Sequence, residues 1–320
     1  MVSHDSAVVI EPFQEAHLFR VQTLINMHLS TMVPGWGLPE AFIASFLHRN
    51  PYQETIDPWV RERMTLCALQ KQRVVAAVHL LRYGNGPEVN PFYQNVGDLA
   101  WFLAWPNADE AAAALLTAAR RQFAAWGVTR EYAWDAGVPV SPFVGVPDVW
   151  PHISRALEAA GYAPRGGKEG EELVYGGPLD AALPDGAPPV TGLTLQRVMG
   201  KIDGACFLAL VDGEVVGQCE CATDLTRGGT LPALRGWGEL SEVEVKEEWR
   251  RRGIGTWLVR QAAAWHQLGG GKRMVLAVLP EDEEAGAGRF YQRLGWQVLV
   301  RQRKGWQWHN RPAAEVPAPA

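Results

Sequence analysis

The sequence contains no long apolar run and few cysteines for its 320 residues. A transmembrane helix needs about 18 consecutive apolar residues, so the chain is not expected to span a bilayer. Four cysteines, Cys67, Cys206, Cys219 and Cys221, are too few for a disulfide scaffold. No further Cys or His lies at ligand spacing from the last two, so no metal site is expected. We expect buried, reduced cysteines in a cytoplasmic protein.

Strong positive charge is also missing. The formal net charge is −5, which argues against a general nucleic-acid binder. The first residues, "MVSHDSAVVIEPF", lack the basic and then apolar layout of a signal peptide, in keeping with a cytoplasmic location. Hydrophobic residues make up 47% of the chain. That content supports packed cores, and the length is sufficient for two domains.

Two segments lack an apolar period and divide the chain. "GGPLDAALPDGAPPVTG" (176–192) is rich in Gly and Pro and is typical of a linker. "RPAAEVPAPA" (311–320) is typical of a disordered tail. We therefore predict a first domain over 1–178, a linker over 179–192, a second domain over 193–310 and a disordered tail.

The two domains repeat one another. "ALQKQRVVAAVHLL" from Ala68 and "ALVDGEVVGQCECA" from Ala209 both predict a β-hairpin, and they lie 141 residues apart. "GDLAWFLA" from Gly97 and "GELSEVEV" from Gly238 keep the same spacing. Two further pairs of segments, each matched at a glycine, keep nearly the same spacing. This pattern indicates a tandem duplication.

The second domain has the clearer element pattern. Its periodicities predict a hairpin over 206–223, a strand over 237–246, a helix over 253–268, a buried strand over 273–279, a short helix over 285–294 and a closing strand or hairpin. This order predicts an α/β fold with a mixed sheet. The first domain adds helix-like stretches over 13–30 and 39–48, which the second domain lacks.

The segment "EEWRRRGIGTWLV" (247–259) places three arginines and two glycines where the second-domain helix begins. The first N–H groups of a helix lack partners and carry partial positive charge. Gly253 and Gly255 let an anion approach these groups, and Thr256 adds a hydroxyl. A Walker loop is absent, and Leu258 stands where a dinucleotide fingerprint needs a third glycine. The segment predicts an anion cradle.

The same segment resembles a known family. "VKEEWRRRGIG" (245–255) resembles motif A of the GCN5-related N-acetyltransferases (GNAT), and "AGAGRFYQRLGW" (285–296) resembles their motif B. The resemblance implies two tandem GNAT-like acyl-CoA N-acyltransferase domains, with acetyl-CoA as co-substrate. It also implies that the strands on either side of the motif A helix splay apart. At a position where the family often has Asn, this chain has Glu284.

The resemblance also implies roles for individual residues. The strand Val243, Glu244 and Val245 would lie along the pantetheine arm, and the Val245 N–H could stabilise the oxyanion. Tyr291 would be the general acid that faces the departing thiolate. Alternatively, it would only hydrogen-bond the sulfur, or it would be a helix-face aromatic residue of the core. The pyrophosphate cradle would consist of Arg250, Arg251, Arg252, Gly253, Ile254, Gly255 and Thr256.

An attacking amine must lose a proton, so a general base is expected. We favour Glu239 and then Glu244, with Glu242 as a third acidic residue on the strand. Simple alternation places Glu239 on the face of Val243 and opposite Glu244. A β-bulge would reverse that parity. All three could instead be solvated strand carboxylates.

The first domain lacks the residues of the cradle. The three arginines align near Ala108–Glu110, the two glycines near Ala111 and Ala113, and Tyr291 with Leu157. Acidic residues suit a plain helix start and would repel a pyrophosphate. We therefore hypothesise a degenerate first domain that does not bind acetyl-CoA. It could supply a wall of the acceptor site or serve stability alone.

The prediction from sequence is an acetyl-CoA-dependent N-acetyltransferase with one active site, in the second domain. The acetyl group would pass directly to a primary amine of a small-molecule or peptide acceptor in a ternary complex. The alternatives are a non-catalytic CoA-binding module and a transferase of another acyl group. Loops 31–40 and 224–238 are candidate walls of the acceptor site. The sequence identifies neither the acceptor nor an oligomeric state.

Overall fold

The computed structural model describes residues 7–49, 56–134, 137–138, 142–165, 170–179, 186–201 and 204–309. The chain forms two compact units. The first unit comprises Met1–Glu171 and Gln302–Ala320, and the second comprises Glu172–Arg301. The predicted tail over 311–320 and residues 180–185 of the predicted linker lie outside the described residues.

The first unit is built on a seven-stranded sheet with the order β1-β2-β3-β4-β5-β15-β7. Its strands are β1 (Val9–Pro12), β2 (Val60–Gln70), β3 (Arg73–Tyr83), β4 (Val96–Ala104), β5 (Arg130–Ala133), β7 (Tyr162–Pro164) and β15 (Trp306–Trp308). Its α-helices are α1 (Leu18–Met32), α2 (Glu40–His48), α3 (Asp109–Trp126) and α4 (Pro151–Ala159). Among the strand pairs of this sheet whose registers are described, only the β4–β5 pair is parallel.

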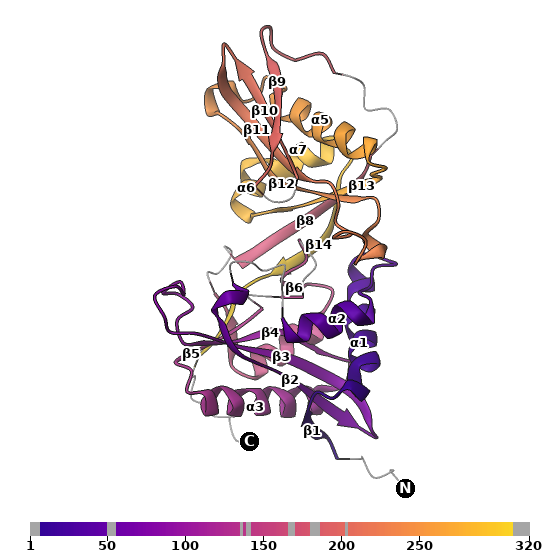
Figure 1. The fold of residues 1–320 in the computed structure, drawn as a ribbon, viewed down its shortest axis with the longest axis vertical. Coiled ribbons are helices and arrows are strands. Elements are labelled where there is room, and N and C mark those ends of the chain that lie inside the picture. Colours follow the sequence, from indigo (N-terminus) through magenta and orange to yellow (C-terminus); the bar gives the residue numbers. More distant parts are fainter. Residues whose placement is uncertain are drawn as a thin grey trace, which may run out of the picture. The chain divides into compact units, whose positions relative to one another are not determined.

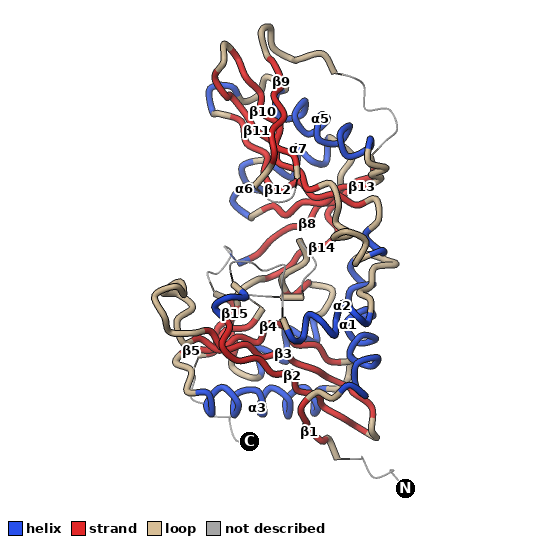
Figure 2. The backbone as a smooth tube through the Cα atoms, viewed as in Figure 1, coloured by secondary structure: helices blue, strands red, loops and turns tan. Residues whose placement is uncertain are grey.

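Helices cover both faces of this sheet (Figures 1 and 2). On one face, Gly97 of β4 leaves room for Phe123 of α3, because an added Cβ would lie 2.6 Å from its ring. On the other face, His79 of β3 stacks on Trp101 and lies 5.9 Å from Phe46 of α2, measured between ring centroids. The core of the first unit is therefore divided into two layers.

The second unit is built on an eight-stranded sheet with the order β6-β14-β8-β13-β12-β11-β10-β9. The strands of this sheet are β8 (Glu171–Pro178), β9 (Thr194–Met199), β10 (Ala205–Val211), β11 (Glu214–Ala222), β12 (Trp237–Val245), β13 (Arg273–Val278) and β14 (Gln297–Arg303), together with the edge strand β6 (Val146–Pro147), whose residues belong to the first unit. Its α-helices are α5 (Ile254–Leu268), α6 (Pro280–Ala285) and α7 (Ala287–Arg293). Within the described part of the chain, no helix is both long and apolar enough to cross a membrane.

The predicted elements of the second domain are confirmed within a few residues. The hairpin β10–β11 turns at Asp212 and Gly213, both with positive φ. The repeat is visible in structural detail, because β4 and β12 begin and end 141 residues apart. Each of these strands carries a bulge at the same place, Ala100 in β4 and Ser241 in β12, where the pairing with the preceding strand shifts by one residue.

The compact units do not follow the predicted domain bounds, because the two halves exchange strands. Residues 172–178 of the first half belong to the second unit, in which β8 lies between β14 and β13. Residues 302–309 of the second half belong to the first unit, in which β15 lies between β5 and β7. Of the two predicted endings of the second half, the closing strand is confirmed as β14, and the hairpin is wrong because β14 and β15 lie in different sheets. Each exchanged strand fills the same place in its sheet, so neither half completes its own sheet.

The second unit also lacks a helical layer that the first unit has. In the first unit, α1 and α2 lie between β1 and β2 in the sequence. In the second unit, β9 pairs with β10 as β1 pairs with β2, but residues 200–204 alone connect them. Among the described residues of the second unit, no helix corresponds to α1 or α2. The face of the sheet opposite α5 therefore has no helix of its own.

A substitution at Trp306 tests how much β15 contributes to the stability of the first unit. Trp306 is 1% exposed and pairs with Ala133 on β5 and with Pro164 on β7. We expect Trp306→Ala to lower the free energy of unfolding by about 3–5 kcal/mol, as for other buried aromatic truncations. Thermal unfolding of the full chain measures this loss. The control Trp265→Ala, at a side chain that is 37% exposed, should lower it by only about 1 kcal/mol. Equal losses would contradict a structural role for β15.

Candidate functional site

The parallel strands β12 and β13 diverge within the second sheet. They pair at Trp237–Arg273, Gly238–Met274 and Glu239–Val275, and the pairing ends there. Both strands continue, β12 to Val245 and β13 to Val278. One edge of β12 beyond Glu239 therefore has no neighbouring strand, as the resemblance implied.

Backbone groups of the two predicted valines line this open edge. The Lys246 N–H donates to the Val216 carbonyl of β11 at 3.0 Å. Since the hydrogen bonds of a strand alternate between its two edges, Val243 and Val245 direct their backbone groups to the side facing β13. The Val245 carbonyl already accepts a bond from Arg250 Nε at 2.9 Å. The Val245 N–H remains available to a ligand.

The start of α5 adds a row of backbone donors. Gly253 is the N-cap residue with φ of 84°, and Arg251 also has a positive φ of 61°. Within the described residues, the N–H groups of Arg251 to Thr256 donate to no protein acceptor. Gly253 and the three arginines before it are exposed, while Ile254 is buried and anchors the helix. This geometry suits a diphosphate, which accepts several hydrogen bonds and carries negative charge.

Local contacts hold the helix start in place. Arg252 lies over the ring of Trp249, 4.8 Å from its centroid. The Trp257 indole N–H donates to the Gly186 carbonyl at 2.9 Å. A Cβ added at Gly253 would lie 3.1 Å from Pro189. The described end of the predicted linker therefore packs beside the cradle.

Tyr291 lies on α7 and is 7% exposed. Its ring packs among Tyr175, Phe290 and Trp296, with centroids 4.9–5.9 Å apart. Its hydroxyl donates to no group within the described residues. Burial, with contributions from Cys219 and Asp282, raises the pKa of Tyr291 well above its ordinary value. The hydroxyl therefore keeps its proton and has no acceptor among the residues that the structure describes.

The bulge at Ser241 decides which face the strand carboxylates occupy. Gly238 points toward His266 of α5, because an added Cβ would lie 2.9 Å from that ring. Glu239 therefore lies on the opposite face, together with Glu242 and Glu244. The parity expected from simple alternation is wrong for Glu239, and the bulged alternative is correct.

The three carboxylates differ in exposure and partners. Glu239 and Glu242 are half-buried, and Glu244 is exposed. Lys201 forms an ion pair with Glu242 at 3.4 Å. The Gln218 amide donates to Glu244 at 3.5 Å. Glu239 is also the residue at which the β12–β13 pairing ends, so it lies where the two strands begin to separate.

The cysteines are all free, and three of the four are buried as expected. Cys206 is the exception and is only half-buried. Burial raises the pKa of Cys67 and of Cys221 to about 12. Burial also raises the pKa of Cys219, which lies near Tyr291. These thiols are therefore poor nucleophiles at neutral pH.

The corresponding region of the first unit is filled by side chains. The Ala104 carbonyl, the counterpart of the Val245 carbonyl, contacts His152 Nε2 at 3.0 Å. The same nitrogen lies 3.1 Å from His28 Nε2. Trp150 packs 5.1 Å from His28 and 6.0 Å from Trp134, which directly follows β5. Both tryptophans are buried, so a continuous row of rings joins β5 to the end of β4.

Electrostatics at the two helix starts also differ. Asp109 and Glu110 occupy the first turn of α3, where α5 has glycine and threonine. Burial lowers the pKa of His28 to about 4, so this histidine is neutral at physiological pH. The side chains in the first turn of α3 therefore carry negative charge, whereas three exposed arginines precede the N-cap of α5.

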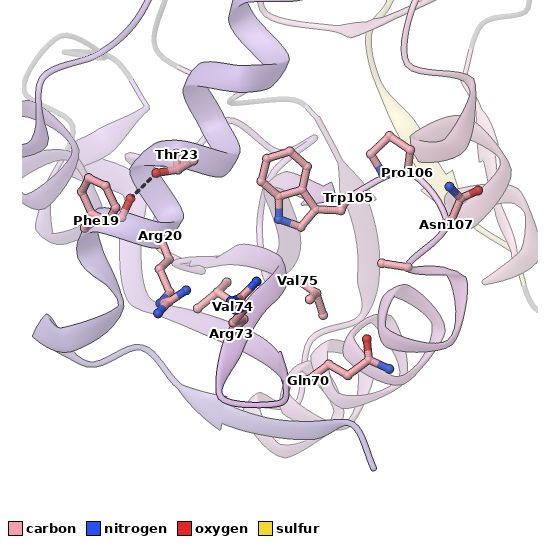
Figure 3. A pocket seen from close by; sticks show the side chains of 11 residues that line it. Phe19, Arg20, Thr23, Gln70, Arg73, Val74, Val75, Trp105, Pro106 and Asn107 are labelled. Carbon is pink, nitrogen blue, oxygen red and sulfur yellow. Dashed lines mark hydrogen bonds between the residues drawn. The ribbon is translucent and has the colours of Figure 1, made fainter. Parts of the chain in front are cut away.

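A cavity of about 470 Å³ lies in the first unit beside the start of α3, whose N-cap Ala108 is among its lining residues (Figure 3). It is bounded by α1, by the turn between β2 and β3, and by residues 105–108 before α3. Figure 3 shows Arg20 and Arg73 on one side and Trp105 above them. Both arginines are exposed.

Comparison with known proteins identifies the second half. Residues 184–296 match the model of the Acetyltransferase (GNAT) family. Over 75 residues the chain is 36% identical to an uncharacterized N-acetyltransferase, YobR, of Bacillus subtilis. That match covers 23% of this chain and only 30% of the length of the relative. Residues 184–296 therefore belong to the GNAT family.

Solved structures extend the fold to the whole chain. A tandem GNAT protein from the clavulanic acid biosynthesis pathway aligns over 96% of this chain and 100% of its own, with a TM-score of 0.62 and 15% identity. A GCN5-related N-acetyltransferase from Sphaerobacter thermophilus aligns over 96% and 97%, with a TM-score of 0.61 and 14% identity. The chain thus has the fold of two tandem GNAT-like domains.

Proposed function

We propose that the protein is an acetyl-CoA-dependent N-acetyltransferase with a single active site, in its second unit. The observation that carries this proposal is the row of backbone N–H groups from Arg251 to Thr256 beside the open edge of β12. The GNAT-family match of the same segment supports it. The absence of a metal from the reaction stays a prediction.

Bound acetyl-CoA would supply an activated thioester. The α5 N–H groups would hold its pyrophosphate, and the arginines of residues 250–252 would add charge. Backbone groups of Val243 and Val245 would align the pantetheine arm as an added strand. The Val245 N–H would stabilise the oxyanion that forms when the amine nitrogen bonds to the acetyl carbon.

Tyr291 would hydrogen-bond the sulfur as the carbon–sulfur bond breaks. Proton transfer from a tyrosine near pKa 10 to a thiolate near 8.5 is already uphill by about 2 kcal/mol. The raised pKa of Tyr291 increases that cost. Tyr291 would therefore stabilise the thiolate mainly as a hydrogen-bond donor.

The proton of the attacking amine needs an acceptor, and Glu239 is our first choice. Its place where β12 and β13 separate, and its partial burial, favour it over the exposed Glu244. Transfer would be direct, without an acyl-enzyme. The raised pKa of Cys219, the thiol near Tyr291, supports this.

We propose further that the first unit does not bind acetyl-CoA. The row of rings from Trp134 to His152 and the acidic start of α3 support this. At the offset that aligns Leu157 with Tyr291, His152 corresponds to Gly286. A glycine leaves room at that place in the second unit, where the first unit has an imidazole.

The activity is tested by adding acetyl-CoA and a panel of amines to the full chain: small amines, aminoglycosides, polyamines and peptides with free N-termini. We expect free thiol to form in step with an acetylated amine, detected by mass spectrometry. If acetyl-CoA binds but no amine releases thiol, the protein is a CoA-binding module instead. If longer acyl-CoA esters react faster than acetyl-CoA, the proposal that acetyl is the transferred group is wrong.

A further inference from the structure

The strand that the first half contributes to the second sheet carries a buried tyrosine. Tyr175 lies on β8, opposite Leu276 of β13 in the antiparallel register. Its side chain is fully buried within the core of the second unit. Neither motif A nor motif B contains this residue, which lies more than 100 positions before Tyr291 in the sequence.

Tyr175 contacts Tyr291 directly and is itself held at its hydroxyl. The two ring centroids are 5.9 Å apart with an interplanar angle of 39°. The Tyr175 hydroxyl donates to the Glu283 carboxylate, whose oxygens lie 3.1 and 3.0 Å away. Burial, followed by this bond to Glu283, raises the pKa of Tyr175, so the hydroxyl stays protonated. The Tyr175 side chain is therefore held by Glu283 at its hydroxyl while its ring packs against Tyr291.

Glu283 connects this tyrosine to the helix that carries Tyr291. It lies on α6, and its carboxylate is seated against the first turn of α7, where a Cβ added at Gly288 would clash with it. The group that holds the Tyr175 hydroxyl thus also contacts the helix of Tyr291. Movement of Tyr175 would loosen both the ring packing and this helix contact.

The Tyr291 hydroxyl has no protein acceptor among the described residues, so no hydrogen bond fixes its direction. Ring packing must do so, and Tyr175 and Trp296 provide it together with the neighbouring Phe290. A displacement of about 1 Å in a reacting group can lower a rate 100-fold. The orientation of Tyr291 is therefore sensitive to the ring beside it.

We propose that Tyr175, held by Glu283, is a positioning residue for Tyr291. Through it, a strand from the first half orients the hydroxyl that stabilises the leaving thiolate in the second unit. This role rests on the proposed acetyl transfer. It also gives the first half a function that does not require a second acetyl-CoA site.

The test uses the full chain with Tyr175→Phe and Glu283→Gln. We expect each to lower kcat about tenfold, by loosening the reacting group, with KM for acetyl-CoA changed less than about twofold. The same substitutions in a Tyr291→Phe background should have almost no further effect on kcat, because coupled residues are not additive. Equal losses in both backgrounds would overturn the proposal.

The first unit provides a matched control. Tyr162 is buried, and its hydroxyl donates to Glu131 at 3.1 Å. Tyr162→Phe removes the same kind of buried bond far from Tyr291 in the sequence, and we expect kcat to stay unchanged. A loss equal to that of Tyr175→Phe would assign both effects to general destabilisation and contradict the proposal.

A second measurement does not depend on turnover. Fluorotyrosine at position 291 reports ring motion through its fluorine NMR line shape. We expect Tyr175→Phe and Glu283→Gln to change the shape of the fluorine NMR line, and we expect Tyr162→Phe to leave it unchanged. If the wild type transfers no acetyl group, the proposed function fails, while the line shape still tests the coupling. A line unaffected by either substitution would overturn the positioning role.

Discussion

Gly255→Asp is expected to weaken acetyl-CoA binding by at least about 100-fold, or about 2.7 kcal/mol. Gly255 lies in the first turn of α5, between consecutive N–H groups that have no acceptor among the described residues. The new carboxylate would place negative charge where the pyrophosphate is proposed to bind. An acidic residue in a first helical turn does not harm the helix itself. Titration calorimetry with acetyl-CoA measures the loss.

Two control variants separate charge from steric effects. Gly255→Ala adds a Cβ that would lie 3.7 Å from Phe290 and Val245, an ordinary contact, so the fold should be unaffected and binding should fall less. Ala113→Asp introduces the same charge at an exposed position in the second turn of α3 and should leave binding unchanged. If Gly255→Asp binds acetyl-CoA as the wild type does, the cradle is not at α5.

Tyr291→Phe is expected to lower kcat roughly 100- to 1,000-fold, the range seen when one preorganised donor to a developing negative charge is removed. The substitution keeps the ring and its packing against Tyr175 and Trp296. It removes only a hydroxyl without an acceptor among the described residues, so stability should change little. Steady-state kinetics should show a loss in kcat with KM for acetyl-CoA nearly unchanged.

The same residue predicts a pH dependence. A raised pKa means that Tyr291 keeps its proton above the ordinary value near 10. Its donor function should therefore persist across the neutral and mildly alkaline range. Loss of the Tyr291 proton should cause no decline of kcat in that range, so the wild type and Tyr291→Phe should have pH profiles of the same shape.

The role of Tyr291 at the sulfur can also be tested with another acyl donor. A donor with a more acidic thiol needs less stabilisation of the leaving thiolate, and it should recover part of the rate that Tyr291→Phe loses. A full loss with such a donor would contradict the role at the sulfur.

Local patterns predicted the elements of the fold well. The hairpin at Asp212–Gly213 and the helix after Gly253 are confirmed. Turn and cap residues determine the backbone conformation of residues only a few positions away, so the sequence is sufficient to predict them. The tandem repeat is confirmed for the same reason, since both halves preserve those local signals at a nearly constant spacing. The roles assigned to Tyr291 and Glu239 remain predictions.

Features that depend on distant partners were left open or missed. A bulge in β12 was one of two alternatives, but its position at Ser241 arises from pairing between β11 and β12, and alternation along one strand does not reveal it. The exchange of β8 and β15 likewise depends on pairing with strands that lie far away in the sequence. Apolar alternation predicts a strand but does not identify the sheet to which the strand belongs. The two sheets have corresponding strand orders, so β8 and β15 each fit the same place in either sheet. Tyr175 was missed because its contact with Tyr291 exists only after that exchange.

The exchange also determines how the central claim can be tested. A fragment of residues 1–178 lacks β15 and would lose the strand that joins β5 to β7 in the first sheet, so its failure to bind acetyl-CoA would prove nothing. The full chain avoids this problem. Calorimetric titration of the full chain with acetyl-CoA should give one site per chain, and that site should be lost in Gly255→Asp. Two sites per chain, or one site that survives this substitution, would contradict a single active site in the second unit.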